Sequence, residues 1–143
     1  MERSYVMVKP EFANYKEVIE EVKRRLNNAG LRVEEEKYIK YDKKSAGEHY
    51  ACHLGKPFYE KLLAYITSDK AYGMIVEGED AISKIRALSG STKDPAKGTI
   101  RYDIPEKLGL EKRVTENVIH SSDSQEAAQK EIAIFKALPK IEE

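Results

Sequence analysis

SYVMVK, residues 4–9, places four hydrophobic side chains in a row near the start of the chain. A short uninterrupted apolar run is typical of a strand that is buried on both faces of a sheet. The apolar residues from Tyr15 to Ala29 then follow helical spacing, and Gly30 is a suitable stop for that helix. Residues 31–41 alternate as a strand, in which the charged stretch EEEK is typical of a solvated sheet edge. This part of the chain therefore predicts a β-α-β unit.

The rest of the chain continues the alternation of helices and strands. Ser45 is expected to cap a short helix, because Glu48 follows it at capping-box spacing, and Pro57 is expected to open another helix that ends near Ile66. The remaining predicted elements are a strand over 71–76, a helix over 80–88, an irregular stretch over 89–113, a strand over 117–120 and a helix over 124–137. Such a long irregular stretch is usually functional or a contact between subunits.

The order β-α-β-(α-α)-β-α-β-α predicts an α/β class of fold. Its two β-α-β units are those that a ferredoxin-like split sheet requires. Because helices connect the strands, we expect parallel or mixed pairing with right-handed crossovers. A length of 143 residues fits one core, so residues 1–143 are predicted to form a single domain.

Composition excludes several classes of protein. Hydrophobic residues at 41% and charged residues at 35% indicate a globular chain, and 25 basic residues against 25 acidic ones argue against a general nucleic-acid binder. The lone Cys52 excludes an intramolecular disulfide and fits a reducing compartment. No apolar run is long enough for a signal peptide or a membrane helix. We therefore expect a cytoplasmic protein with no membrane partner.

The short motifs for phosphate binding, metal binding and hydrolysis do not by themselves assign a function to the chain. The chain has neither a P-loop nor a GxGxxG turn, so any bound phosphate must rely on charged side chains. HYACH, residues 49–53, spaces two histidines by one helical turn, but Tyr50 stands where a metalloprotease helix needs Glu, and a structural zinc site is disfavoured. HSSD, residues 120–123, holds the letters of a hydrolase triad without a GxSxG elbow, which disfavours a serine hydrolase.

One segment is more specific than these short motifs. NVIHSSDS, residues 117–124, resembles the active-site signature of the nucleoside diphosphate kinases, which reads Asn, two apolar residues, His, a small residue and Ser-Asp-Ser. Further segments that resemble this family follow in its order: MVKP at 7–10, EHYACH at 48–53, GKPF at 55–58, GTIR at 98–101 and EIA at 131–133. The resemblance spans residues 4 to 135. It implies an α+β, ferredoxin-like βαββαβ sandwich with a four-stranded, mostly antiparallel sheet, extra helices and a long loop before the active-site strand.

The resemblance implies a ping-pong enzyme that passes the γ-phosphate of a nucleoside triphosphate such as ATP to a nucleoside diphosphate such as GDP. His120 would carry the phosphoryl group, and its imidazole is available because an unperturbed histidine has a pKa near ~6.5. Glu131 would hold the unused ring nitrogen in one tautomer, with Ser122 orienting the carboxylate. Lys9 would neutralise charge on the transferred group, and Tyr50 would donate a hydrogen bond to it.

The same resemblance implies the nucleotide contacts: Arg86, Thr92, Arg101 and His53 for the phosphates, Lys9 for phosphate and sugar, Asn117 for the ribose, and Phe58 and Val114 for the two faces of the base. Stacking accepts any base, so purine and pyrimidine nucleotides are both expected as substrates. Mg²⁺ would bridge the phosphates with no direct protein ligand. The family further implies a homo-hexamer or homo-tetramer.

The chain departs from the family pattern at several positions. Residues 11–12 are Glu-Phe where Asp-Gly is usual, Ser121 replaces a glycine, residues 115–116 are Thr-Glu where Gly-Arg is usual, and Tyr102 replaces another glycine. Residues 104–111 are the predicted insertion in the loop before the active-site strand. Two alternatives stay open: a catalytically weak nucleotide-binding or scaffold protein of the same fold, and an RNA-binding ferredoxin-like module, which the zero net charge disfavours.

Overall fold

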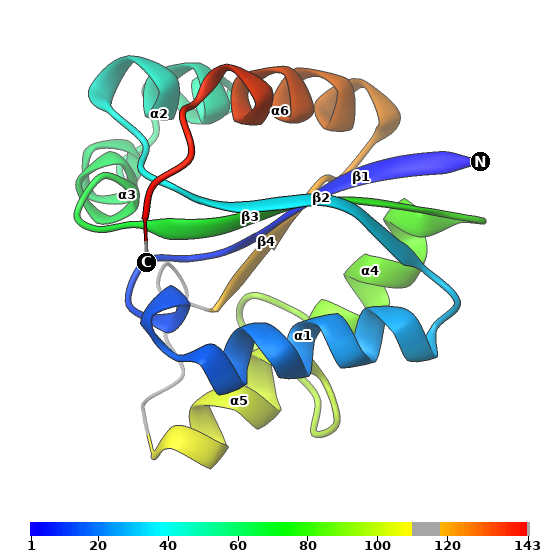
Figure 1. Cartoon of the computed structure of the whole chain (residues 1–143). Coiled ribbons are helices and arrows are strands. Elements are labelled where there is room, and N and C mark those ends of the chain that lie inside the picture. Colours follow the sequence, from blue (N-terminus) through cyan, green and yellow to red (C-terminus); the bar gives the residue numbers. More distant parts are fainter. Residues whose placement is uncertain (110–117, 143) are drawn as a thin grey trace.

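Four strands pair into one sheet in the computed structural model, which describes residues 1–109 and 118–142. They are β1 (Glu2–Val8), β2 (Arg32–Ile39), β3 (Ala71–Gly78) and β4 (Ile119–Ser121), in the order β2-β3-β1-β4 (Figure 1). Every neighbouring pair runs antiparallel, so the expectation of parallel or mixed pairing was wrong and the antiparallel sheet implied by the resemblance is confirmed. The strands within each β-α-β unit, β1 with β2 and β3 with β4, are parallel but not adjacent. β3 lies between β1 and β2, and β1 lies between β3 and β4.

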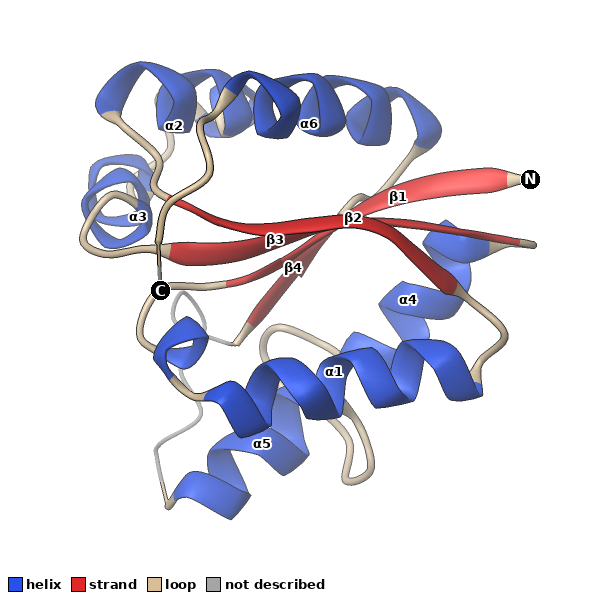
Figure 2. Ribbon diagram, viewed as in Figure 1, coloured by secondary structure: helices blue, strands red, loops and turns tan. Residues whose placement is uncertain are grey.

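Six α-helices in the described residues cover the two faces of this sheet. Helices α1 (Lys16–Asn28), α4 (Ala81–Ser89) and α5 (Ile100–Leu108) lie on one face, and α2 (Lys43–His49), α3 (Tyr59–Ile66) and α6 (Gln125–Ala137) lie on the other (Figure 2). Two short 3₁₀ turns precede α1 and α3, at Phe12–Asn14 and Ala51–His53. None of the helices in the described ranges has the length and apolar character needed to cross a bilayer.

Strand β1 explains why its apolar run decides the fold. Val6 and Val8 point into the core under α1, α4 and α5, whereas Tyr5 and Met7 point into the core under α2, α3 and α6. All four side chains are completely buried, as the uninterrupted pattern predicted. β1 is therefore a central strand, and β4, which carries residues 119–121 of the signature, pairs with it at the sheet edge.

Gly73 in β3 sets the distance between α6 and the sheet. A Cβ atom at Gly73 would lie 2.6 Å from the Cε1 atom of Phe135, so only glycine lets that ring rest on the strand. Phe135 lies one helical turn after Glu131, and both are buried. Anchoring the phenyl ring on the sheet therefore holds the carboxylate of Glu131 close to β1 and β4.

The starts of helices α2 and α3 differ from the predicted ones by two or three residues. Asp42, not Ser45, is the N-cap of α2: its carboxylate accepts the Ser45 N–H at 2.7 Å, and Ser45 Oγ accepts the Asp42 N–H at 3.0 Å. Ser45 is thus the returning partner of the capping box instead of its start. Helix α3 begins at Tyr59, two residues after Pro57, and its N-cap is Phe58.

The irregular stretch expected over 89–113 contains a helix, α5, so the prediction of an irregular chain was wrong for residues 100–108. Ile100 and Ile104, spaced by one turn, are buried against the core, and Gly109 ends the helix in the left-handed conformation with φ 71°. Pro105 lies inside the helix, which is why the sequence favoured a loop. The predicted insertion at 104–111 overlaps α5, and its last two residues lie outside the described ranges.

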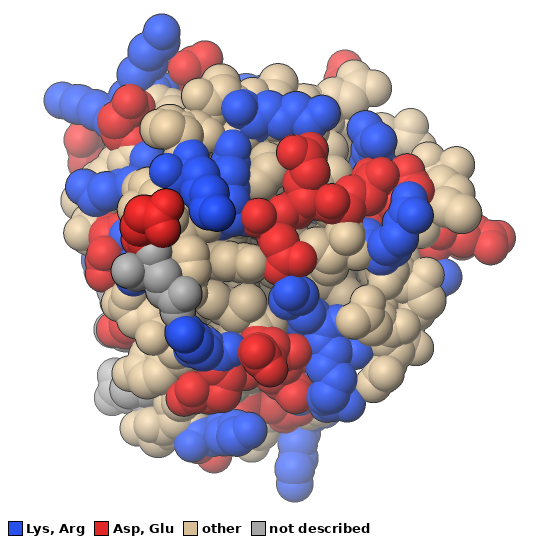
Figure 3. Space-filling model, viewed as in Figure 1, with Lys and Arg blue, Asp and Glu red and all other residues tan. Residues whose placement is uncertain are grey.

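Acidic and basic side chains are interspersed on the face of the described residues that Figure 3 shows. Ion pairs also form along the β2 edge, where Arg3 contacts Glu34 at 2.9 Å and Lys23 contacts Glu36 at 2.6 Å. Strand β2 is the solvated edge that its charged stretch predicted. Ile141 adds an isolated bridge to Tyr38 at this edge.

Candidate active site

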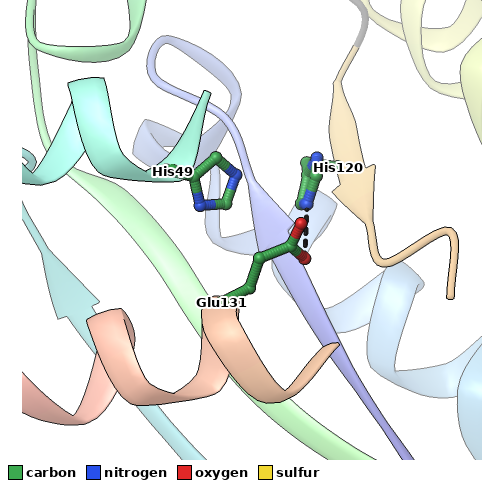
Figure 4. A group of neighbouring side chains, drawn as sticks. All are labelled: His49, His120 and Glu131. Atoms are coloured by element: carbon green, nitrogen blue, oxygen red, sulfur yellow. Dashed lines mark hydrogen bonds and ion pairs between the residues drawn. The ribbon is translucent and has the colours of Figure 1, made fainter. Parts of the chain in front are cut away.

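His120 lies in the middle of β4, opposite Met7 of β1, and its side chain is 18% exposed. Its Nε2 atom is 2.9 Å from Oε1 of Glu131, which reaches it from α6 (Figure 4). A carboxylate accepts hydrogen bonds, so Nε2 carries the ring proton and Nδ1 keeps its lone pair. The arrangement therefore leaves one ring nitrogen of His120 ready to act as a nucleophile.

A chain of hydrogen bonds holds the Glu131 carboxylate in place. Ser122 Oγ donates to Oε1 of Glu131 at 2.8 Å, and the backbone N–H of Tyr5 donates to the same Oγ at 3.0 Å. Ser122 is completely buried and Glu131 is 7% exposed. The structure thus brings together the three residues His120, Glu131 and Ser122, and it links them to the central strand β1.

A cavity of about 630 Å³ opens on one side of His120, and we call it the phosphate-side cavity. It is lined by His53, Arg86, Ala87, Gly90, Ser91, Thr92, Arg101, His120, Ser121 and Asp123. The set contains Arg86, Thr92, Arg101 and His53, which the resemblance assigned to the phosphates, but not Lys9, which it assigned to phosphate and sugar. Two guanidinium groups against one carboxylate give the cavity the charge that a polyphosphate needs, and Arg offers a planar fork of donors for it.

Arg101 is built into the wall of this cavity. Its guanidinium donates to the backbone oxygens of Gly90, at 2.6 Å, and Ile119, at 2.8 Å, and so ties the segment after α4 to β4. Burial lowers the pKa of Arg101 to about 10, with a contribution from Arg86, and the group stays charged at pH 7. Its Nε atom has no hydrogen-bond partner within the described part of the chain.

Lys9 is 7% exposed and lies at the end of β1, where its backbone N–H donates to the Val118 oxygen at 2.8 Å. Burial, assisted by the charge of Arg101, lowers the pKa of Lys9 to about 7. Val118 has φ 80°, which is strained for a β-branched residue. The hydrogen bond to Lys9 therefore helps to hold a strained backbone two residues before His120.

The other predicted site residues differ in burial and in their distance from His120. Tyr50 is buried, and its hydroxyl has no partner among the described residues; its ring lies 6.3 Å from that of His120. Phe58 is 42% exposed, and its ring lies 5.3 Å from that of His53. At the departure at residues 11–12, Glu11 is the N-cap and Phe12 the first residue of the 3₁₀ turn before α1. The predicted contacts of Val114 and Asn117 lie outside the described residues.

Sequence reasoning gave His49 no part in the site, considering it only for a disfavoured zinc site. It ends α2, is 4% exposed, and its ring lies 4.6 Å from the ring of His120. Neither of its ring nitrogens has a hydrogen-bond partner among the described residues. Helical periodicity alone indicates that His49 faces inward with Ala46, but not that it meets a histidine from a distant strand.

The chain is similar to known proteins over most of its length. The family model of nucleoside diphosphate kinases matches residues 2–139. The nucleoside diphosphate kinases of Staphylococcus epidermidis and Metallosphaera sedula are each 40% identical, over 94% of this chain and 87% and 92% of their own lengths. A halophilic nucleoside diphosphate kinase from Halobacterium salinarum, solved in complex with CDP, is 36% identical with a TM-score of 0.84 and covers 99% of this chain and 93% of its own.

Proposed function

This chain belongs to the nucleoside diphosphate kinase family, and from that membership we propose that His120 is the residue that carries the phosphoryl group. The protein is an enzyme, a phosphotransferase that moves the γ-phosphate of a nucleoside triphosphate to a nucleoside diphosphate through a phosphohistidine intermediate. The single observation that supports His120 is its hydrogen bond to Glu131, because the bond assigns the ring proton to Nε2 in a side chain that lines the phosphate-side cavity.

The first half-reaction follows from this geometry. The lone pair of His120 Nδ1 attacks the γ-phosphorus, a P–N bond forms, and the bond to the bridging oxygen breaks, so that the nucleoside diphosphate leaves with that electron pair. The ring gains positive charge, which the carboxylate of Glu131 stabilises at Nε2–H. In the second half-reaction a terminal oxygen of another nucleoside diphosphate attacks the same phosphorus, and the P–N bond breaks to restore the neutral ring.

The remaining side chains bind and position the nucleotide. Arg86, Thr92 and Arg101, supported by His53, are proposed to hold the phosphates that are not transferred, because they line the cavity beside His120. Tyr50 and Lys9 are proposed to act on the transferred group. Phe58 is proposed to stack on the base, since its ring is partly exposed. Val114 and Asn117 are proposed for the base and the ribose on the resemblance alone.

The donor set fits magnesium that arrives with the nucleotide. Mg²⁺ prefers six oxygen ligands, and among the described residues the phosphate-side cavity offers only one carboxylate, Asp123. We therefore propose Mg²⁺ as the cofactor, with phosphates and water as its main ligands and no direct protein ligand. Such an ion, when bound, neutralises charge on the phosphate oxygens during transfer.

We also propose a domain organisation, a cellular location and a state of assembly. Residues 1–143 are proposed to act as one domain, because both cores lie against the same sheet. Cytoplasmic location is proposed from the single, exposed Cys52, whose thiol is free. Assembly as a homo-hexamer or homo-tetramer is proposed from the family resemblance.

The function is tested by following phosphate through the wild-type protein. We expect γ-labelled ATP with Mg²⁺ to label the protein in an acid-labile form, and GDP to remove the label as GTP. Mass spectrometry of peptides at neutral pH is expected to place the phosphoryl group on His120 and not on His49 or His53. Binding of ATP without labelling would instead favour the catalytically weak, nucleotide-binding alternative.

Lys9 makes nucleotide binding depend on pH. With a pKa of about 7, its amine is mostly neutral at pH 8 in the free protein. Bound phosphates stabilise the charged amine and raise its pKa, so binding of a nucleoside diphosphate at pH 8 is expected to take up nearly one proton, about 0.9. Calorimetry in two buffers with different ionisation enthalpies measures this uptake. The Lys9→Gln variant is expected to lose it, and equal heats for the wild type in both buffers would contradict the role of Lys9.

A further inference from the structure

A second cavity, of about 520 Å³, lies on the α6 side of His120, and we call it the rear cavity. His49, His120 and Glu131 all line it. Its charge is opposite to that of the phosphate-side cavity, because its described lining holds three carboxylates, Asp123, Glu126 and Glu131, against one ammonium group, Lys130. The lining of the phosphate-side cavity thus favours anions, and the described lining of the rear cavity favours cations.

We propose that the rear cavity binds a divalent transition-metal ion, zinc above all, through His49, His120 and Glu131, and that this ion inhibits phosphoryl transfer. One ring nitrogen of each histidine and one carboxylate oxygen lie within 4.8 Å of one another. Figure 4 shows the side chains of His49 from α2 and Glu131 from α6 pointing toward the His120 ring. Two His and one carboxylate, with a water in the fourth position, form a known type of open zinc site.

The unpartnered ring of His49 is the observation that points to a ligand. A buried polar group without a hydrogen bond is costly, and neither nitrogen of His49 has a partner among the described residues. A neutral imidazole has one ring nitrogen whose lone pair can bind a metal ion. A metal ion in the cavity would use a lone pair that the protein alone leaves unused.

The geometry needs only a small closure around the ion. Two nitrogen ligands on one tetrahedral zinc ion lie about 3.4 Å apart, whereas His120 Nε2 and Glu131 Oε1 are already 2.9 Å apart. The widest pair in the group therefore has to approach by at most about 1.4 Å to bind one zinc ion. Imidazole nitrogens favour zinc, copper, nickel and cobalt over magnesium, so the Mg²⁺ required for catalysis does not compete.

Inhibition rests on the proposed function, whereas metal binding does not. An ion bound to Nε2 of His120 uses the lone pair of that nitrogen, so the ring proton moves from Nε2 to Nδ1. Nδ1 then has no lone pair with which to attack phosphorus, and the Glu131 carboxylate, bound to the ion, no longer accepts a hydrogen bond from the ring. The ion therefore acts without entering the phosphate-side cavity.

Metal binding is tested on the unphosphorylated wild-type protein by nuclear magnetic resonance. The chain has three histidines, so each imidazole can be followed separately in ¹⁵N-labelled protein. Zinc is expected to shift the ring nitrogens of His49 and His120 and to leave those of His53 in place. Cobalt is expected to give a visible absorption band that zinc removes. Unchanged His49 resonances at saturating zinc would overturn the proposal, whatever the activity of the protein.

Inhibition is tested by titrating free zinc, held by a metal buffer, during phosphoryl transfer from Mg-ATP to GDP. Each variant is compared with its own zinc-free rate. The His49→Gln variant is expected to need at least about tenfold more zinc for half-inhibition, because it lacks one ligand. Cys52→Ser is the matched control: it removes the exposed thiol of the same cavity and is expected to keep both the zinc-free rate and the zinc sensitivity.

The outcomes separate the two proposals. Zinc shifts on His49 and His120 in a protein that never transfers phosphate would retain the metal site and reject the proposed role of His120. Equal zinc sensitivity of the wild type and a folded His49→Gln variant would reject the metal site and leave the kinase mechanism in place. Loss of zinc sensitivity in Cys52→Ser would assign the metal to the thiol and also reject the site.

Discussion

Replacing His120 with glutamine is expected to lower phosphoryl transfer from ATP to GDP by at least about 10⁴-fold, because an amide has no nucleophilic nitrogen. Glutamine is close to histidine in size and still donates a hydrogen bond toward Glu131, so the loss reports chemistry more than packing. The pre-steady-state burst of labelled protein is also expected to disappear. Both quantities are measured by mixing γ-labelled ATP with the variant and stopping the reaction at neutral or alkaline pH, where phosphohistidine survives.

His53→Gln is the matched control for this substitution. His53 lines the same phosphate-side cavity and is the third histidine of the chain, but it contacts Lys56, at 3.3 Å, instead of a carboxylate. Its loss is expected to slow transfer less than about tenfold, the effect of one weak phosphate contact. If the His120→Gln variant still transferred phosphate at a tenth of the wild-type rate or faster, the nucleophile would be another group, and His49 would be the first to examine.

The sequence indicates most of the fold through strand β1 and the unit that follows it. Four buried residues in a row place β1 at the centre of the sheet. Helix α1 and the solvated edge strand β2 follow from the periodicity of their hydrophobic residues. The direction of neighbouring strands does not follow from periodicity. Local spacing cannot indicate which strand lies between the two parallel strands of a β-α-β unit. The resemblance to a known family supplied that information, which residue patterns lacked.

Helix α5 and the cap of α2 were missed for different physical reasons. Pro105 is a strong helix breaker, and only the burial of Ile100 and Ile104 against the core compensates for the hydrogen bond that it removes. Asp42 and Ser45 form a reciprocal capping box, in which either residue can be mistaken for the start. For α5, tertiary packing decides between a loop and a helix. For α2, the direction of the side-chain hydrogen bonds decides which residue is the cap.

The candidate site was predictable in its residues but not in its contacts. His120 and Glu131 are separated by the turn between β4 and α6, and no spacing rule brings a strand histidine to a buried helix glutamate. Glu131 taken alone has the pattern of a solvated helix position, yet it is 7% exposed. His49 was passed over because its environment is formed by three segments that are distant in sequence.

Glu131→Gln is expected to slow formation of the phosphoenzyme by about 10²-fold, close to 2.7 kcal/mol in activation free energy. Both hydrogen bonds to this side chain, from His120 Nε2 and from Ser122 Oγ, end on the same atom, Oε1. An amide oxygen accepts both bonds as well as a carboxylate oxygen does, so glutamine preserves the tautomer of His120. What it removes is the negative charge that stabilises the imidazolium form as the P–N bond develops.

Single-turnover kinetics separates this electrostatic role from a structural one. If Glu131 acts as a positioning residue with a charge, the maximal rate of labelling falls while the dissociation constant of ATP stays within about twofold. Ser122→Ala is the matched variant, because it removes one hydrogen bond from Oε1 and keeps the charge. Its labelling rate is expected to fall less than about tenfold, with a loss of about 1–3 kcal/mol in stability from the unsatisfied Tyr5 N–H. Equal rates for Glu131→Gln and the wild type would show that the tautomer alone matters, because the amide retains every contact except the charge.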